Sequence, residues 1–409
     1  MGKPKIRFRG YTDDWEQRKF SELYEKNVEK NTELIGYDKT ISIATMTYKD
    51  EGNGASDESL KTYKVLRTGD LAFEGHTNKD FRYGRFVAND IGTGIMSPRF
   101  STLRPVKDMP VSFWKYYIHY EPIMRSVLVN STKAGTMMNE LVVADFMKQS
   151  IRVPSIGEQE KIGEYFSNLD HLITLHQRKC EETKKLKKYM LQKMFPQNGQ
   201  VVPEIRFSGF TDDWEQRKLL SCIQSITDFR GRTPKKLGMD WSESGYLALS
   251  ALNVKDGYID FSQDVHYGNQ ELYDKWMSGK ELHRGQVLFT TEAPMGNVAQ
   301  VPDNKGYILS QRTIAFDVEE EILSENFLAT LLRTPNVFND LTALSSGGTA
   351  KGVSQKSLSG LDVVIPKNID EQNKLADYFI NLDHLITLHQ NKCDELKKIK
   401  KFMLQNMFV

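Results

Sequence analysis

The chain has 409 residues, which is long enough for two or more domains with cores of their own. Its 55 lysines and arginines are balanced by 54 acidic residues, so the net charge of +1 excludes a globally basic nucleic-acid-binding protein and leaves only local basic patches. The three cysteines form no CxxC pair, and no apolar run approaches the ~20 residues that span a bilayer, so we expect a cytoplasmic protein without disulfides.

Two stretches of the chain occur twice. Gly10–Lys19 returns as Gly209–Lys218 with nine matches in ten positions, inside a longer repeat of residues 4–19 and 203–218. Tyr165–Cys180 returns as Tyr378–Cys393 with fourteen matches in sixteen positions. Chance does not produce such matches, so the chain is a tandem duplication.

The first repeat contains the run Thr12-Asp-Asp-Trp-Glu16. Asp13 can accept hydrogen bonds from backbone amides and cap a helix, with Glu16 reaching back. The same run can equally turn into a short strand, and both alternatives stay open. We interpret Trp15 and Trp214 as packing anchors rather than ligand platforms.

The regions between the repeats, 20–152 and 219–364, have diverged in sequence. Weak correspondences join Leu66–Phe73 to Leu282–Phe289 and Ile95–Arg99 to Ile308–Arg312. Apolar runs between turn residues predict strands, and each region also holds one longer apolar segment that predicts a helix. The predicted strands are Thr40–Thr47, Leu71–Phe73, Val287–Thr291 and Leu361–Ile365, and the predicted helices are Val111–Val127 and Glu325–Leu341.

The second repeat forms the centre of a predicted helix of roughly 37 residues, about 55 Å long. Apolar or small residues recur at alternating spacings of three and four, which is the heptad pattern of helices that pack along their length. The seam residues of this pattern are Phe166, Leu169, Ile173, His176 and Cys180 in the first copy, and Phe379, Leu382, Ile386, His389 and Cys393 in the second. The two histidines and two cysteines can in principle ligate zinc, but we interpret them as packing residues and predict no metal site.

Loops rich in glycine, hydroxyl and cationic residues are the candidates for DNA contact, because backbone amides, hydroxyls and long cations suit phosphate. Arginine and glutamine can also read guanine and adenine edges bidentately. Solvated surface, or hydrogen bonds that only support other residues, are the alternatives. The candidates are Asn78, Lys79, Arg82, Tyr83, Arg85, Arg99, Ser131, Thr132 and Lys133 in the first region, and Arg230, Arg232, Thr233, Lys235, Gln311, Arg312, Ser346, Gly347, Gly348, Thr349 and Lys351 in the second.

Several catalytic signatures are missing from the sequence. There is no GxxxxGK[ST] phosphate loop, no glycine-rich dinucleotide fingerprint after a strand, no HExxH, and no Asn- or Asp-Pro-Pro-aromatic tetrapeptide of amino-methylating enzymes. A duplicated chain without a catalytic constellation is most simply a protein that binds and positions other molecules. We therefore predict no catalytic residue in it.

Each diverged region ends in a related motif that enters the predicted helix: Pro154-Ser-Ile-Gly-Glu-Gln-Glu-Lys-Ile162 and Pro366-Lys-Asn-Ile-Asp-Glu-Gln-Asn-Lys-Leu375. The repeated helix sequence Leu-Asp-His-Leu-Ile-Thr-Leu-His-Gln and the motif Gly231-Arg-Thr-Pro234 near the start of the second region belong to the same pattern. On these motifs, nearly the whole chain resembles the specificity subunits of type I restriction–modification enzymes. The first region lacks an equivalent of Gly231–Pro234, so its entry contacts depart from that pattern.

The resemblance implies an α+β fold with two mixed α/β target-recognition domains. They would be held apart by two long antiparallel coiled-coil helices with an internal pseudo-twofold duplication. The expected divisions are the first recognition domain at 1–153 with its repeat at 4–19, the first helix at 154–196, a linker at 197–204, the second domain at 205–365 with its repeat at 205–218, and the second helix at 366–409.

The resemblance also implies a role without catalysis. Each domain would read one half of a bipartite, asymmetric site in double-stranded DNA, and the helices would set the spacer. Two methyltransferase (modification) subunits would dock on the helices and bring S-adenosylmethionine, and restriction/translocase subunits would use ATP and Mg; no membrane is expected. The alternatives are a stand-alone DNA methyltransferase or nuclease, and a structural coiled-coil adaptor.

Overall fold

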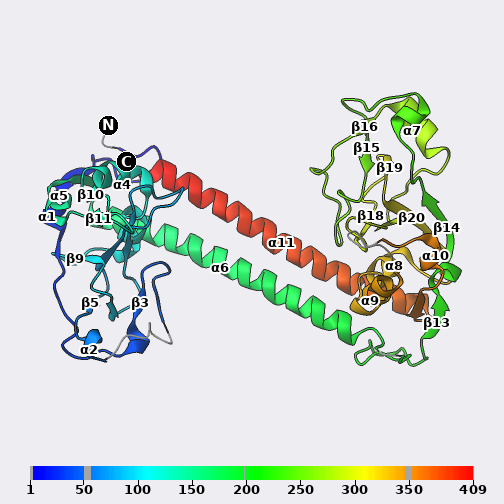
Figure 1. Ribbon diagram of the computed structural model, residues 1–409, viewed down its shortest axis with the longest axis horizontal. Coiled ribbons are helices and arrows are strands. Elements are labelled where there is room, and N and C mark those ends of the chain that lie inside the picture. Colours follow the sequence, from blue (N-terminus) through cyan, green and yellow to red (C-terminus); the bar gives the residue numbers. More distant parts are fainter. Residues whose placement is uncertain (1–2, 50–56, 198, 346–351, 409) are drawn as a thin grey trace. The chain divides into compact units, whose positions relative to one another are not determined.

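The computed structural model describes residues 3–49, 57–197, 199–345 and 352–408 (Figure 1). The chain forms two compact units. Unit 1 comprises Met1–Gln177 and Asn391–Val409, and unit 2 comprises Arg178–Gln390. Each unit therefore combines one mixed α/β domain with the beginning of one long helix and the end of the other. We call the part of unit 1 from β1 to β12 the first domain, and the part of unit 2 from β13 to β21 the second domain.

The two predicted long helices are confirmed as α6 (Ile156–Lys193), with 38 residues, and α11 (Ile369–Met407), with 39. Inside unit 2 they run antiparallel, because Lys187 pairs with Asp383 at 2.5 Å while the later Phe195 packs on the earlier Phe379. Inside unit 1, Lys400 pairs with Asp170 at 2.6 Å and the later Phe408 packs on the earlier Phe166, so the direction is again antiparallel.

The predicted seam residues lie on the inner faces of these helices. Seven of the ten are buried: Phe166, Leu169, Ile173, Cys180, Phe379, Leu382 and Cys393. The other three, His176, Ile386 and His389, are half-buried. Within unit 2, the Cys180 thiol donates to the Ile386 carbonyl and to Gln390 Oε1, both at 3.8 Å. Small polar seam residues thus form hydrogen bonds along the packed helices.

The N-terminal repeats form short strands, which decides between the two alternatives left open by the sequence. Strand β1 (Glu16–Lys19) pairs antiparallel with β12 (Ser150–Val153), and β13 (Glu215–Lys218) pairs in the same way with β21 (Asp362–Ile365). Trp15 and Trp214 are 4% and 2% exposed, so their role as packing anchors is confirmed.

The Glu-Gln pair of the helix-entry motif has a structural explanation. Arg7 of the first repeat contacts the buried Glu158 carboxylate through Nε at 2.6 Å and Nη2 at 2.8 Å. Gln159 donates through Nε2 to the carbonyl of Pro154 at 2.9 Å. The glutamate therefore attaches the repeat to the helix, and the glutamine closes the turn that starts the helix.

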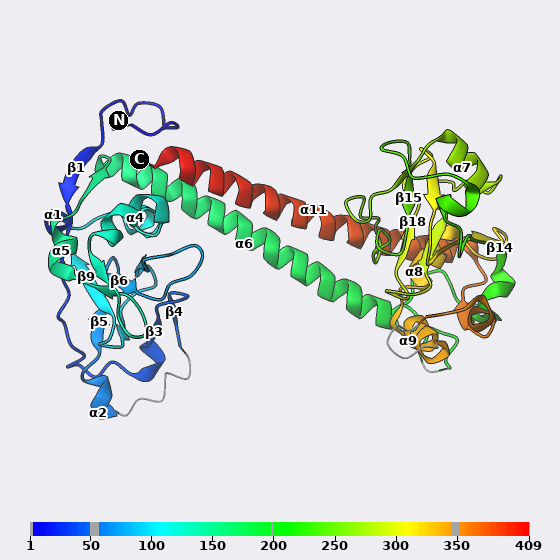
Figure 2. The same cartoon turned by 45° about the horizontal axis from the view of Figure 1, so that its top comes forward.

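The ends of the long helices also meet the repeats. The Ile6 amide donates to the Asn406 carbonyl at 2.9 Å, and the Ile205 amide donates to the Lys193 carbonyl at the same distance. The N-terminal segment of unit 1 consequently lies beside the last turn of α11, as Figure 2 shows near the two marked chain ends. A terminal carbonyl of each helix thereby gains a donor.

The first domain is built on an antiparallel four-stranded sheet in the order β2-β9-β6-β7. Its strands are β2 (Tyr24–Lys26), β9 (Ser101–Pro105), β6 (Leu71–Glu74) and β7 (Arg85–Ala88). Smaller pairs are β3 (Ile41–Ser42) with β4 (Thr47–Tyr48), β5 (Lys64–Leu66) with β8 (Gly94–Met96), and β10 (Thr132–Lys133) with β11 (Glu140–Leu141). The helices are α1 (Phe20–Leu23), α2 (Asp57–Leu60), α3 (Val111–Tyr117), α4 (Glu121–Val129) and α5 (Val143–Lys148), with a 3-10 turn η1 (Tyr37–Lys39).

The second domain repeats this plan with the order β14-β20-β17-β18. Its strands are β14 (Ile223–Asp228), β20 (Thr313–Val318), β17 (Val287–Thr290) and β18 (Val298–Gln300). A second sheet holds β16 (Tyr267–Gly268), β15 (Tyr246–Leu249) and β19 (Tyr307–Leu309), with β15 parallel to β19. The helical elements are η2 (Leu219–Cys222), η3 (Pro234–Leu237), α7 (Gln270–Met277), α8 (Glu325–Leu331), α9 (Pro335–Leu344) and α10 (Gln355–Leu358).

The two sequence correspondences are confirmed by this topology. Leu66–Phe73 and Leu282–Phe289 lead into β6 and β17, which are the third strands of the two four-stranded sheets. Ile95–Arg99 and Ile308–Arg312 begin in β8 and β19 and lead toward β9 and β20. Arg99 and Arg312 therefore occupy equivalent turns in the two domains.

Three predicted elements were wrong in detail. The predicted strand Thr40–Thr47 is a hairpin of β3 and β4, whose turn includes Met46 at φ +50°. Each predicted domain helix is two helices, because α4 and α9 begin with a proline in their first turn. Proline lacks the amide that would continue the preceding helix, and it disfavours α geometry in the residue before it.

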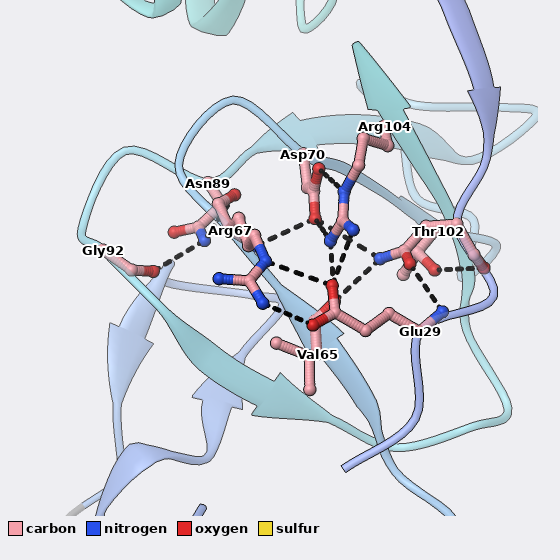
Figure 3. A network of polar contacts seen from close by, with 9 residues as sticks. Glu29, Val65, Arg67, Asp70, Asn89, Gly92, Thr102 and Arg104 are labelled. Carbon is pink, nitrogen blue, oxygen red and sulfur yellow. Dashed lines mark hydrogen bonds and ion pairs between the residues drawn. The ribbon is translucent and has the colours of Figure 1, made fainter. Parts of the chain in front are cut away.

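Figure 3 shows a polar network beside the sheet of the first domain. Asp70, whose side chain is 1% exposed, accepts from Arg104 through Nε at 3.0 Å and Nη2 at 2.8 Å. Glu29 accepts from Arg104 Nη1 and from Arg67 Nη2, each at 2.6 Å. The hydrogen bond from Arg67 is the largest cause that lowers the pKa of the Glu29 carboxyl.

The second domain has different groups at the same place. Leu71 pairs with Leu103 in one sheet, and Val287 pairs with Phe316 in the other. The residues that precede Leu71 and Val287, Asp70 and Gln286, are therefore equivalent. The residues that follow Leu103 and Phe316, Arg104 and Asp317, are equivalent for the same reason. There Gln286 Nε2 donates to Asp317 Oδ1, and Ser225 Oγ donates to Asp317 Oδ2, both at 2.5 Å. The charge pair of the first domain is thus replaced by neutral donors around one carboxylate.

Candidate nucleic-acid interface

Two predicted loops of the second domain meet at one concave surface. Residues after β14 and residues between β19 and β20 line a cavity of about 400 Å³. Five predicted DNA-contact residues line it: Arg232, Thr233, Lys235, Gln311 and Arg312. Gln311 and Arg232, which are 79 residues apart in the sequence, are therefore brought together.

Some of these residues are bound to the scaffold. The Arg232 guanidinium donates to the Trp276 carbonyl and lies 4.1 Å from the centre of the Phe229 ring. Thr233 accepts from the Lys236 amide at 3.3 Å and caps η3. Gln311 donates through Nε2 to the Arg232 carbonyl at 3.2 Å. The hydrogen bond between Gln311 and Arg232 joins the two loops.

The remaining cations of the site face solvent. Arg312 and Lys235 are exposed, and so is Arg230, which lies 3.6 Å from Asp228 in an ion pair. Arg312 has φ +64°, and its Nε lies 3.1 Å from Glu292 Oε1. Exposed cations beside a concave surface are suitable for contacts with phosphate or base edges.

Another part of the cavity wall was not predicted from the sequence. The Trp241 ring stacks on His266 with centroids 5.4 Å apart, and His266 Nε2 lies 3.1 Å from Asp264 Oδ1. Ser250 Oγ donates to Asp264 Oδ2 at 2.6 Å. These residues come from separate loops with no shared spacing, so no sequence pattern joined them. Glu292, directly after a predicted strand, was also missed.

In the first domain, Arg99 lines a cavity of about 430 Å³ together with residues 136–141. None of the other predicted residues of this domain lines that cavity. Arg99 is exposed and lies beside the ring of Phe100 at 5.6 Å from its centre. Arg99 thus faces a concave surface at the place where Arg312 does in the second domain.

The loop between β6 and β7 carries the other predicted cations of the first domain. Asn78 Oδ1 accepts from the amides of Asp80 and Phe81 at 2.8 and 3.0 Å, which fixes the loop as a tight turn. Lys79 and Arg82 are exposed, and Tyr83 is half-buried. The two exposed cations of this turn are available to an anionic ligand.

Burial and internal bonds occupy several other predicted residues. Ser131 is 1% exposed and its hydroxyl donates to the Val127 carbonyl at 2.7 Å, so direct contact with DNA is excluded for it in this conformation. Thr132 donates to the Leu128 carbonyl at 2.7 Å, and Arg85 pairs with Glu74 at 2.6 Å. Lys133 is exposed but pairs with Glu140 at 3.1 Å.

Five predicted residues lie outside the part of the chain that the structure describes: Ser346, Gly347, Gly348, Thr349 and Lys351. Among the described residues, no group of three or more His, Cys, Asp or Glu side chains is placed to hold a metal ion. In the same described ranges, no helix is both long and apolar enough to cross a membrane.

Comparison with known proteins gives matches in both halves of the chain. The family model of the type I restriction modification DNA specificity domain matches residues 95–185 and 211–398. The type I restriction enzyme MjaVIII specificity subunit of Methanocaldococcus jannaschii is 23% identical over 293 residues, which are 70% of this chain and 67% of that protein. A second protein of that organism, provisionally named type I restriction enzyme MjaX specificity subunit, is 20% identical over 408 residues, which are 95% of this chain and 91% of the relative.

Among solved structures, the S subunit of a type I restriction-modification system from M. genitalium aligns with 100% of this chain and 99% of its own. The TM-score is 0.59 and the sequence identity is 12%. At this identity the likeness shows a common fold.

Proposed function

We infer the function of this chain from its family: the chain belongs to the type I restriction modification DNA specificity family, whose model matches it once in each half. It is a DNA sequence-recognition subunit of a type I restriction–modification system. This double match is the observation that carries the assignment, because two copies of one recognition domain on a repeated pair of helices are what a reader of a split DNA site requires.

Each domain is proposed to read one half of a bipartite, asymmetric site. Support comes from the equivalent turns that carry Arg99 and Arg312 beside a concave surface in each domain. The side chains around the two arginines differ, so the two sites offer different hydrogen-bonding groups to base edges. An identical pair of sites would instead read a symmetric sequence.

The proposed contacts divide into two classes. Arg99 and Arg312 are assigned to base edges, because each arginine ends in a planar fork that matches two acceptors. Exposed cations on the surrounding turns are assigned to phosphates, where they add affinity without sequence preference. These phosphate contacts are Lys79, Arg82 and Lys133 in the first domain and Arg230 and Lys235 in the second.

The long helices are proposed to dock two modification subunits. In unit 2, the large apolar side chains of Leu186, Leu385 and Leu388 are exposed on α6 and α11, and Leu388 is 60% exposed. In unit 1, Leu172 and Phe402 are exposed on the same helices. Exposed apolar side chains on an otherwise charged helix favour a protein partner.

The proposed divisions of the chain are the first recognition domain at 1–153, the first helix at 154–196, the linker at 197–204, the second recognition domain at 205–365 and the second helix at 366–409.

Catalysis is assigned to the partner subunits, which are proposed to bring S-adenosylmethionine for methylation and ATP with Mg for restriction. The test compares the purified full chain, the modification subunits alone, and the two mixed, each with genomic DNA and S-adenosylmethionine. The mixture should methylate one split motif, and neither component alone should do so. Methylation or cleavage by the chain alone would show an enzyme, and a motif independent of this chain would show a structural adaptor.

A further inference from the structure

The backbone around Arg312 is held by hydrogen bonds from Thr291. The Arg312 carbonyl accepts from the Thr291 amide at 2.9 Å and from the Thr291 hydroxyl at 3.3 Å. Thr291 is 3% exposed, and its own carbonyl accepts from the Val353 amide at 2.9 Å. Arg312 itself has φ +64°, a left-handed conformation that a non-glycine residue keeps only where its surroundings hold it. The turn that carries Arg312 is therefore attached to the end of β17.

The side chain of Arg312 is held by the next residue of the same segment. Its Nε lies 3.1 Å from Glu292 Oε1, with about half of each side chain exposed, 54% for the arginine and 46% for the glutamate. Glu292 also bridges to Gly352 through its backbone. Backbone and side chain of Arg312 thus depend on two consecutive residues, Thr291 and Glu292.

The nitrogen through which Arg312 contacts Glu292 determines which of its donors remain for DNA. A guanidinium carries five N–H donors in one plane, one on Nε and four on the two terminal nitrogens. When a carboxylate occupies the Nε side, the two terminal nitrogens remain for another partner. Guanine presents two adjacent acceptors, O6 and N7, in the major groove, and arginine binds them bidentately.

We propose that Glu292 is a positioning residue that orients Arg312 to read a guanine in the half-site of the second domain. This inference rests on the proposed function. The carboxylate limits the rotation of a long side chain, so that less conformational freedom is lost when the base contact forms. It also places a negative charge near DNA, which repels phosphate.

Neighbouring candidates are less suited to this contact. Gln311 donates its amide nitrogen to the Arg232 carbonyl, whereas a bidentate adenine contact needs both its nitrogen and its oxygen. Arg232 is bound to the Trp276 carbonyl and stacked on Phe229. Arg312 also lines the cavity, and its guanidinium pairs with the Glu292 carboxylate through Nε, whereas Gln311 and Arg232 donate to backbone carbonyls.

The experiment uses the full chain in complex with its modification subunits. The motif is first determined by sequencing the methylated genome, and binding is then measured on duplexes with each single-base substitution in the second half-site. Arg312→Ala should lower the preference for guanine at one position by about 5- to 150-fold, the equivalent of a lost bidentate contact. Glu292→Ala should lower the preference at that same position by up to about 5-fold.

Affinity and specificity should move in opposite directions for Glu292→Ala. Removal of the negative charge should raise the affinity for all sequences, while the preference for guanine falls. A general loss of structure would instead lower both quantities. Glu292→Gln keeps an oxygen acceptor and should retain most of the preference. Glu271→Ala is the matched control, because Glu271 is an exposed carboxylate in an ion pair with Lys275 on α7 and does not line the cavity.

The outcomes separate this inference from the proposed function. If Arg312→Ala changes one position and Glu292→Ala changes none, or changes a different one, the role of Glu292 is refuted while sequence reading by this domain stands. A uniform loss of binding for Arg312→Ala would assign that arginine to phosphate and overturn the guanine contact. A complex that binds without sequence preference before any substitution would refute the proposed function itself.

Discussion

In unit 1, Arg7 contacts the buried carboxylate of Glu158 through two nitrogens at 2.6 and 2.8 Å. In unit 2, Arg206 makes the same two contacts with Glu371 at the same distances. The charge pair between the long helices is repeated as well, with Asp170 and Lys400 in unit 1 and Asp383 and Lys187 in unit 2. These two kinds of ion pair, between repeat and helix and between the two helices, therefore occur in both units.

The interiors of the two domains differ where their sheets are alike. Asp70 and Arg104 form a charge pair in the first domain, whereas Gln286 and Asp317 form a hydrogen bond at the equivalent positions of the second. The third partner of the interhelical pair also differs, because Tyr116 donates to Asp170 while Arg333 donates to Asp383. The ion pairs between the two long helices thus occur in both units, whereas the contacts that each domain adds to them differ.

The largest expected effect tests the shared contact. Arg206→Ala leaves Glu371 buried without its cation and should destabilise unit 2 by about 3 kcal/mol. Arg7→Ala should destabilise unit 1 by a similar amount. Glu371 keeps a donor in Trp214 Nε1 at 3.2 Å, so the effect in unit 2 should be the smaller of the two.

Hydrogen exchange measured by mass spectrometry reports on the two units separately, which a single unfolding curve does not. Arg18→Ala, which removes an exposed ion pair with Glu16, is the control and should change protection little. An effect confined to one of the two units would contradict the equivalence of the two contacts.

The interhelical pairs should respond unequally, because their third partners differ. Asp383→Ala leaves Lys187, whose side chain is 12% exposed, without its carboxylate, and leaves Arg333, which is 11% exposed, with its other partner Asp256; it should cost about 3 kcal/mol. Asp170→Ala leaves Lys400 at 25% exposure and removes the acceptor of the Tyr116 hydroxyl, and should cost about 1 kcal/mol. Exchange protection of α6 and α11 in each variant measures both costs, and equal losses would show that Arg333 adds nothing.

The smallest expected effect concerns pH. The pKa of Glu29 is lowered, first by the hydrogen bond from Arg67, so its contribution is complete above the unfolded value of about 4.3 and is lost as pH falls through the folded pKa. The pKa of Glu325 is raised, first by burial, so its carboxyl contributes in the opposite sense and stability falls as pH rises through that pKa.

Thermal midpoints between pH 3 and pH 7 compare these two carboxyls. Glu29→Gln should destabilise at pH 7 by about 1 kcal/mol or less and have a smaller effect at pH 3. Glu325→Gln should remove the decline of stability with rising pH instead. Parallel profiles for the two variants would refute the assigned directions.

The two long helices could be predicted from the sequence, because Tyr165–Cys180 is repeated and its heptad spacing reflects local helix geometry alone. The breaks before α4 and α9 were missed, although Pro122 and Pro335 indicate them. At the site, composition indicated the loops that carry Arg312 but not which cations are bound to the scaffold. That distinction depends on contacts such as Arg232 with Trp276, which join residues far apart in the sequence.

The two domains are proposed to read DNA independently of each other on the repeated helices. Exchange of residues 219–364 for the corresponding region of another family member, followed by sequencing of the methylated genome, tests it most directly. One half of the methylated motif should change, while the other half and the spacer between them should stay the same. A change in both halves, or in neither, would contradict it.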